Sequence, residues 1–191
     1  MEELTSQEYE LLKDREFLIT KRVIHHKVMG VLRAAESAIR EQLLQANYPF
    51  PTDLLARSGK ISHGENYREL PYWVLDYPRK FQTDATFAFR TMVWWGHESS
   101  CALQVGGSHV EGLNLGSIMD DFFFCLNKDP WEYHFAEDNY VKAVNLSLDD
   151  RNQHRTQYGF IKIARQSPLT DLKRLPYFAS KTFCDALISL S

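Results

Sequence analysis

The chain has 191 residues, of which 44% are hydrophobic and 25% charged, and its formal net charge at pH 7 is -3. That length favours one domain with a core large enough to fold without a disulfide or a structural metal. The acidic balance argues against a nucleic-acid partner, because proteins that bind nucleic acids carry a basic face.

Cysteine usage and the N-terminal sequence both indicate a cytoplasmic protein. The three cysteines, Cys101, Cys125 and Cys184, are odd in number and widely spaced, unlike those of a disulfide framework or a zinc site. Residues 1–14 are acidic and amphipathic, whereas a secretory signal has a basic start followed by an apolar stretch. No apolar run is long enough to cross a bilayer, so we expect no membrane partner.

Helical periodicity dominates residues 1–46. Thr5 or Ser6 is a suitable N-cap, and we expect a break near Thr20 between a short helix and a long one. Along the long helix, apolar residues recur at steps of three and four: Ile24, Val28, Val31, Ala35, Ile39 and Leu43. An earlier apolar side consists of Leu11, Leu12, Leu18 and Ile19. The prolines of residues 48–51 end the element, because proline cannot continue a helix.

The middle of the chain predicts strands. Residues 53–56 fit a helical turn, and residues 72–77 fit a strand that Pro78 closes. Residues 86–95 alternate, with Phe87, Phe89, Thr91, Val93 and Trp95 on one face and Ala88, Arg90, Met92 and Trp94 on the other. A turn at residues 96–99 and a returning strand at residues 100–105 complete an antiparallel hairpin.

The last third of the chain predicts further helices and one strand. Residues 117–126 fit a helix, and Asp129 followed by Pro130 fits the start of another. The polar residues 148–157 are expected to form a loop, residues 158–164 a strand and residues 176–190 a closing helix. Helices at both ends and strands between them predict a single domain of the α+β class, with a central antiparallel sheet.

Residues 60–96 contain the densest polar and aromatic pattern. Their sequence resembles an uncharacterised family of bacterial proteins that carry a motif like ISxGENYxxLPYxxLDYPRxF followed by RTMxWWG. The likeness extends more loosely to the flanking helices and to residues 131–140. The resemblance implies a self-contained fold and no particular activity. The matching residues are Ile61, Ser62, Gly64, Glu65, Asn66, Tyr67, Leu70, Pro71, Tyr72, Leu75, Asp76, Tyr77, Pro78, Arg79, Phe81, Arg90, Thr91, Met92, Trp94, Trp95 and Gly96.

This segment holds our candidate ligand site. Asp76 and Arg90 fall on neighbouring predicted strands and could form a bidentate pair. Arg90 with aromatic walls would suit a small anionic or planar molecule, and the strand face of Arg90, Met92 and Trp94 is too apolar to be bare. Either the N-terminal helices cover that face or something binds there. The candidate site residues are Glu65, Asn66, Tyr67, Asp76, Arg79, Arg90 and Trp94.

Other interpretations stay open. The same polar groups could simply satisfy one another in the core and cap turns. A second hypothesis is a self-associating module anchored by exposed Trp94 and Trp95, and a third is an enzyme with Glu65 or His63 as general base. We expect no cofactor and no metal, because the sequence contains no P-loop, GxGxxG, GxSxG or HExxH motif.

Overall fold

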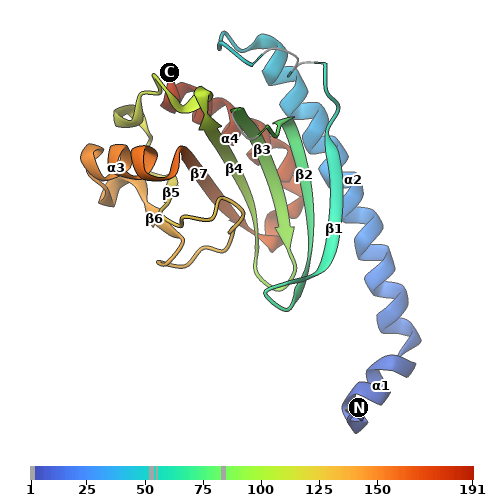
Figure 1. Ribbon diagram of the computed structural model, residues 1–191. Helices are drawn as coiled ribbons and strands as arrows, with labels where there is room; N and C mark the ends of the chain where they lie inside the picture. Colours follow the sequence, from blue (N-terminus) through green and yellow to red (C-terminus); the bar gives the residue numbers. More distant parts are fainter. Residues whose placement is uncertain (1–2, 52–53, 55, 83–84) are drawn as a thin grey trace.

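The computed structural model describes residues 3–51, 54, 56–82 and 85–191. In these ranges, seven strands form one antiparallel sheet of order β1-β2-β3-β4-β7-β5-β6, with helices before and after it, so the α+β class is confirmed (Figure 1). The strands are β1 Lys60–Tyr67, β2 Leu70–Lys80, β3 Ala85–Trp94, β4 Glu98–Gly107, β5 Phe123–Cys125, β6 Tyr140–Lys142 and β7 Phe160–Pro168. The α-helices are α1 Ser6–Lys13, α2 Arg15–Gln45, α3 Leu148–Tyr158 and α4 Leu175–Leu190. No helix of the described residues has the length and apolar character needed to span a membrane.

The N-terminal helices break at Asp14 and not near Thr20, as the sequence had led us to expect. The Asp14 side chain accepts a hydrogen bond from the backbone N–H of Phe17 at 2.9 Å, so this residue caps α2. Thr5 caps α1 as predicted, in a reciprocal capping box with Glu8. The apolar pattern continues across Asp14, but the break falls at this residue, because its side chain satisfies a backbone N–H at the start of α2 that would otherwise lack a partner.

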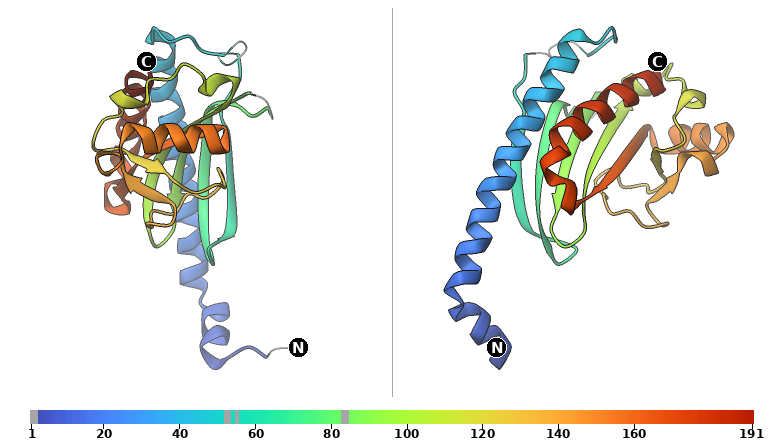
Figure 2. Two further views of the ribbon diagram at one scale, coloured as in Figure 1. Left: turned by 60° about the vertical axis from the view of Figure 1, so that its left-hand side comes forward. Right: turned by 180° about the vertical axis from the view of Figure 1, so that it is seen from behind.

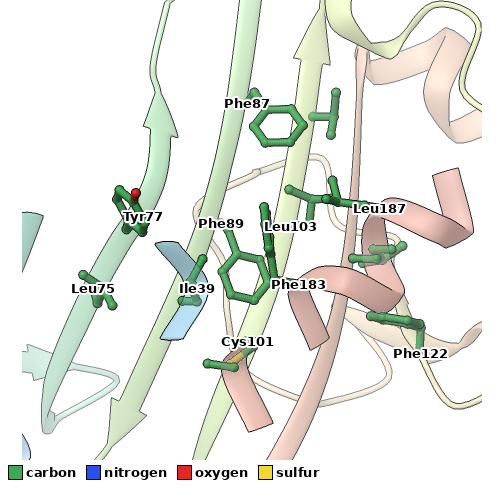
Figure 3. Packing of buried hydrophobic residues seen from close by; sticks show 14 of the residues in the cluster. Ile39, Leu75, Tyr77, Phe87, Phe89, Cys101, Leu103, Phe122, Phe183 and Leu187 are labelled. Atoms are coloured by element: carbon green, nitrogen blue, oxygen red, sulfur yellow. The ribbon is translucent and has the colours of Figure 1, made fainter. Parts of the chain in front are cut away.

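Helices α2 and α4 cover one face of the sheet, and the main core lies between them and that face (Figures 1 and 2). The predicted stripe of α2 is buried at Val28, Ala35, Ile39 and Leu43, together with Leu32, which the prediction omitted. Figure 3 shows α4 residues such as Phe183 and Leu187 meeting Phe89 and Leu103 of the sheet. Each such side chain contributes about 1.5–3 kcal/mol when it is fully buried.

The predicted hairpin is confirmed, and the sheet extends beyond it on both sides. Strands β3 and β4 pair from Ala85 opposite Gly107 to Val93 opposite Ser99. Pro78 does not close β2; the pairing with β3 instead becomes irregular between Asp76 and Arg79, which accommodates a residue that lacks an N–H. Strand β1 lies at the edge of the sheet and was not predicted, because its polar residues lack the alternation of a half-buried strand.

Three predictions for the last third of the chain are wrong. Residues 117–126 contain the short strand β5 where we expected a helix, and Asp129 caps a turn through Trp131 and starts no helix. Residues 148–157 belong to the helix α3, which a capping box of Ser147 and Asp150 starts. The closing helix and the late strand are confirmed as α4 and β7. The turn expected at residues 53–56 lies partly outside the described residues.

Candidate functional site

The face of the sheet away from α2 and α4 is covered by residues 126–139, which connect β5 to β6 and which we call the cover segment (Figure 2). Tyr133 of this segment packs into a second hydrophobic cluster with Met92 and Trp94. The N-terminal helices therefore do not cover the Arg90 strand face. The chain covers that face with its own irregular segment.

Asp76 and Arg90 form the predicted pair at the centre of this face. They lie directly opposite one another on β2 and β3, and the Arg90 Nε and Nη2 donate to the two Asp76 carboxylate oxygens at 2.7 and 2.9 Å. Burial lowers the pKa of the Arg90 guanidinium, but the Asp76 hydrogen bonds, together with the charge of the Asp76 carboxylate, outweigh this and raise it overall. The guanidinium is therefore permanently charged.

A second cation, Lys162, lies on the same face and was not predicted. It is 0% exposed, and its Nζ donates to the backbone carbonyl of Pro130 at 2.9 Å and to that of Glu132. Burial lowers its pKa to about 8. The alternation of β7 could have shown it, because Lys162 stands between two buried isoleucines, on the face opposite to theirs.

A row of directly opposed residues joins Lys162 to Arg79. In this row Lys162 faces Gln104, Gln104 faces Ala88, and Ala88 faces Arg79 across four strands. The Arg79 Nε and the Gln104 Oε1 are buried and have no hydrogen-bond partner among the described residues. We call the surface of Arg79, Arg90 and Lys162 the cationic face. In the described part of the chain, the buried carboxylate next to this face is that of Asp76, which pairs with Arg90.

The ring of Tyr133 lies between the partly buried Arg90 and the buried Lys162. Its centre lies 4.7 Å from the Arg90 Cζ and 4.3 Å from the Lys162 Nζ. The Trp131 ring is 5.4 Å from Arg90, and the Tyr140 ring is 5.3 Å from Lys162. Burial raises the pKa of Tyr133, so its phenol is neutral at pH 7. The cover segment thus fills the cationic face with an uncharged aromatic group.

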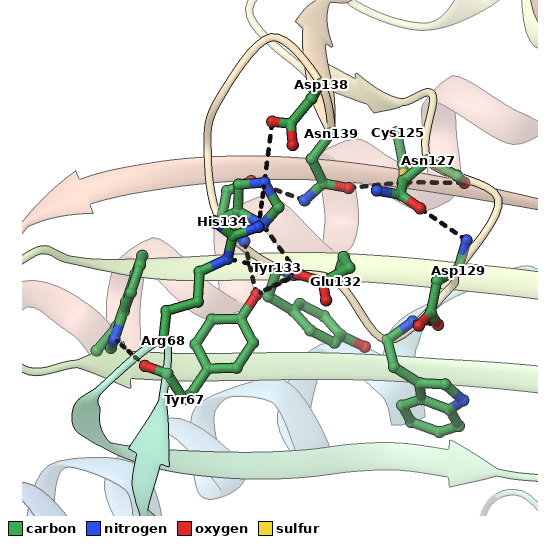
Figure 4. A network of polar contacts seen from close by, with 12 residues as sticks. Tyr67, Arg68, Cys125, Asn127, Asp129, Glu132, Tyr133, His134, Asp138 and Asn139 are labelled. Atoms are coloured by element: carbon green, nitrogen blue, oxygen red, sulfur yellow. Dashed lines mark hydrogen bonds and ion pairs between the residues drawn. The ribbon is translucent and has the colours of Figure 1, made fainter.

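Polar contacts fasten the cover segment at the β1–β2 end of the sheet (Figure 4). The Tyr67 hydroxyl accepts hydrogen bonds from the backbone N–H groups of Tyr133 at 2.7 Å and His134 at 3.1 Å, and it donates to the Glu132 carboxylate at 3.1 Å. The buried His134 ring lies between two carboxylates, with Nδ1 3.0 Å from Glu132 and Nε2 3.0 Å from Asp138. These contacts place the ring of Tyr133 over the sheet.

The seven predicted site residues do not form a single site. Tyr67, Arg90 with its partner Asp76, and Trp94 border the cover segment. Arg79 lies farther along β2, opposite Ala88, and the exposed Glu65 pairs with Lys21 of α2 at 2.8 Å. The Asn66 side chain accepts a hydrogen bond from the backbone N–H of Glu69 and so stabilises the β1–β2 turn. His63 lies near Glu65 on the same strand, with its ring 4.9 Å from that of His25.

Trp94 is not an exposed anchor for self-association. It is 5% exposed, its Nε1 donates to the Tyr67 carbonyl at 3.2 Å, and the His97 ring stacks on it at 3.7 Å. Trp95 is half-buried against the main core. The hypothesis of a self-associating module therefore cannot rely on Trp94 as an exposed contact residue.

An open cleft of about 640 Å³ lies elsewhere, beside the start of α4. The buried Thr182 Oγ1 and the Arg165 Nε at this cleft have no hydrogen-bond partner in the described ranges. Arg165 is already paired with Asp121 and Asp185. Within the same ranges, no group of three or more His, Cys, Asp or Glu side chains could hold a metal ion. The cleft is lined by Asp121, Arg165, Ser167, Asp171, Arg174, Tyr177, Phe178, Lys181 and Thr182.

Comparisons with known proteins identify no relative. No family model matches the chain, and neither a curated protein nor a solved structure was found to be similar to it. The resemblance of residues 61–96 to a bacterial family stays a prediction.

Proposed function

We propose that this is a cytoplasmic protein that binds a small planar anion, such as an aromatic carboxylate, on the cationic face in place of Tyr133. The position of the Tyr133 ring between Arg90 and Lys162 carries this proposal. A cation over an aromatic ring gains about 2 kcal/mol when both are desolvated. A carboxylate would gain more from the same two cations, because its hydrogen bonds to them are charge-assisted.

The charge balance of the face supports an anionic ligand. Burying a charge is costly unless it is paired, and Asp76 balances only Arg90. Lys162 is held by two neutral carbonyls, and Arg79 leaves its Nε without a partner among the described residues. The face therefore has room for one further negative charge.

The shape of the face supports a planar ligand of about the size of a tyrosine side chain. The space holds one phenol ring, and further rings from Trp131 and Tyr140 border the two cations. The ligand would displace Tyr133, and the cover segment would move together with this residue. Segments of this length without secondary structure are uncommon in compact domains and frequently functional.

The experiment removes the ring that fills the space. Tyr133→Ala should bind 4-hydroxyphenylacetate at least tenfold more tightly than the natural chain in isothermal titration calorimetry, because the ligand no longer competes with Tyr133. The neutral amide of the same acid should bind neither protein. Tyr133→Ala combined with Arg90→Met should lose the binding while circular dichroism shows a retained fold.

The matched control is Tyr177→Ala, which removes a tyrosine that is 70% exposed at the open cleft. It should leave the affinity unchanged. A folded Tyr133→Ala protein that binds neither this acid nor benzoate would refute the proposal. Ligand binding that Tyr177→Ala abolishes would instead favour our second candidate, a ligand site in the open cleft next to the unpartnered Thr182 Oγ1.

We also keep membership of the uncharacterised bacterial family as a proposal. Tyr67, Asp76 and Arg90 belong to its motif, and all three hold or border the cover segment. If the proposal is right, chains with this motif should carry a cation at the position of Lys162 and an aromatic residue at that of Tyr133. Aligning the sequences of chains that carry the motif, and reading the residues at these two positions, would test it.

A further inference from the structure

The N-terminal helices project beyond the body of the protein. Figure 2 shows α1 and the first turns of α2 extending past the end of the sheet, with no other element beside them. Every residue from 3 to 20 is exposed. The segment nevertheless carries large apolar side chains, among them Leu12 at 63% and Ile19 at 59% exposure.

An isolated segment of this kind is not expected to be helical by itself. Helix α1 has eight residues and buries none of them, whereas isolated helices shorter than about 12–15 residues are marginal in water. Apolar side chains that share a side occur on both helices: Tyr9 and Leu12 three positions apart on α1, and Ile19 and Val23 four positions apart on α2. Both helices therefore present a surface that a partner would stabilise.

The charges of the segment divide into two blocks of opposite sign. Residues 3–16 contain five acidic and two basic side chains, whereas residues 17–34 contain four basic and no acidic ones. Lys27 continues the Ile19 and Val23 stripe at the next step of four, and Arg22 lies three positions after Ile19. An acidic apolar helix is thus followed by a basic apolar one in the same chain.

We propose that the segment of residues 3–27 pairs with the same segment of a second copy, antiparallel about a two-fold axis. The acidic α1 of each copy then lies over the basic, apolar stripe of the partner's α2. Tyr9 and Leu12 pack on Ile19 and Val23, and every contact occurs twice, as an isologous dimer requires.

The charge pattern favours an antiparallel second copy over two other partners, a parallel copy and an anionic membrane. A parallel pair would place acidic block against acidic block and basic against basic, which is repulsive. An anionic membrane would repel the acidic α1, since helices that lie on such membranes carry lysine and arginine on their polar side. The antiparallel copy satisfies both blocks at once.

The experiment measures the mass in solution by light scattering at micromolar concentration. The natural chain should have twice its monomer mass of 22.3 kDa. Leu12→Ser with Val23→Ser should reduce it to the monomer mass, and Tyr177→Ser, an exposed tyrosine on α4, should leave the dimer intact. All the substituted positions are solvent-exposed, so circular dichroism should show an unchanged fold.

Charge reversal tests the orientation. Glu3→Lys with Glu10→Lys should be monomeric, as should Arg22→Glu with Lys27→Glu, and an equimolar mixture of the two should dimerise. One chain that carries all four changes should also dimerise, since both blocks are reversed together. A natural chain that is a monomer at all concentrations overturns the proposal, and so does a dimer that survives Leu12→Ser with Val23→Ser. A monomer that binds neutral vesicles would also overturn the proposal, because the partner of the segment would then be a membrane surface.

Discussion

Replacing Tyr67 with phenylalanine tests whether the cover segment is a fastened but movable part of the protein. The Tyr67 hydroxyl is the acceptor for two backbone N–H groups of the cover segment, those of Tyr133 and His134. Phenylalanine keeps the ring and its contacts with Tyr72 and Trp94, and removes only the hydroxyl, which accepts these two hydrogen bonds and donates one to the Glu132 carboxylate. The substitution therefore isolates the fastening from the packing.

The magnitude follows from the two N–H groups left without a partner. An unsatisfied buried donor costs about 1–3 kcal/mol. Tyr67 is half-buried, so water can reach the site in part, and we take the lower end for each group. The closed position of the cover segment should thus lose about 2 kcal/mol, which corresponds to about a 30-fold change in its opening equilibrium.

Hydrogen exchange measures this equilibrium directly. In Tyr67→Phe the amides of residues 130–140 should exchange about 30-fold faster, and in both proteins they should be less protected than those of β3 and β4, because the segment opens without global unfolding. If the ligand needs the open segment, its apparent affinity should rise by up to the same factor, since the competent state becomes more populated. Tyr177→Phe is the matched control, because that side chain is 70% exposed.

Two results would refute the reasoning. Unchanged exchange at residues 133 and 134 would mean that the Tyr67 hydroxyl does not hold the segment. Protection of residues 133 and 134 as strong as that of β3 and β4 would mean that the segment opens only when the protein unfolds. In the second case a ligand could not reach the cationic face without global unfolding.

Two further predictions concern the charges below the cover segment. Asp76→Ala should lower the free energy of unfolding in urea by about 3–5 kcal/mol, because Arg90 stays buried without its partner, and Asp76→Leu with Arg90→Met should recover most of it; a loss below about 1 kcal/mol would mean that water already solvates the pair. For Lys162, the folded pKa of about 8 lies below the ordinary 10.5, so above pH 8 the unfolded chain binds a proton that the native chain has released. The free energy of unfolding should therefore rise by about 2 kcal/mol between about pH 8 and 9.5, relative to Lys162→Met measured in parallel; equal slopes for the two proteins would contradict the buried position of the ammonium group.

Local patterns determined much of the framework. The apolar stripe of α2 specifies which side of that helix is buried. The alternation of β3 specifies which residues share a face, and both faces of this strand are buried. The Asp76–Arg90 pair followed from the same logic, because the two residues lie on adjacent strands only 14 positions apart. Capping boxes also depend on residues only three positions apart, although the polar residues after Ser147 led to the prediction of a loop there.

Tertiary structure decided the elements whose partners are distant. Helix α3 has little apolar periodicity, and its buried Arg151 is held by the carbonyls of Leu115 and Ala143. Strand β5 exists because β7 and β6 offer it backbone partners on both sides. In such elements the intrinsic preference is weak, so the neighbours supplied by the rest of the chain determine the conformation.

The candidate site shows the same division. The sequence by itself determined that Arg90, Met92 and Trp94 share a strand face and that this face needs a cover. Only the tertiary structure decided that residues 126–139 supply it, that Lys162 joins Arg90 there, and that Glu65 belongs to a different contact with α2. The physical reason is range: periodicity reports which side of an element is buried, whereas the group that buries it comes from a distant part of the chain that packing alone brings into place.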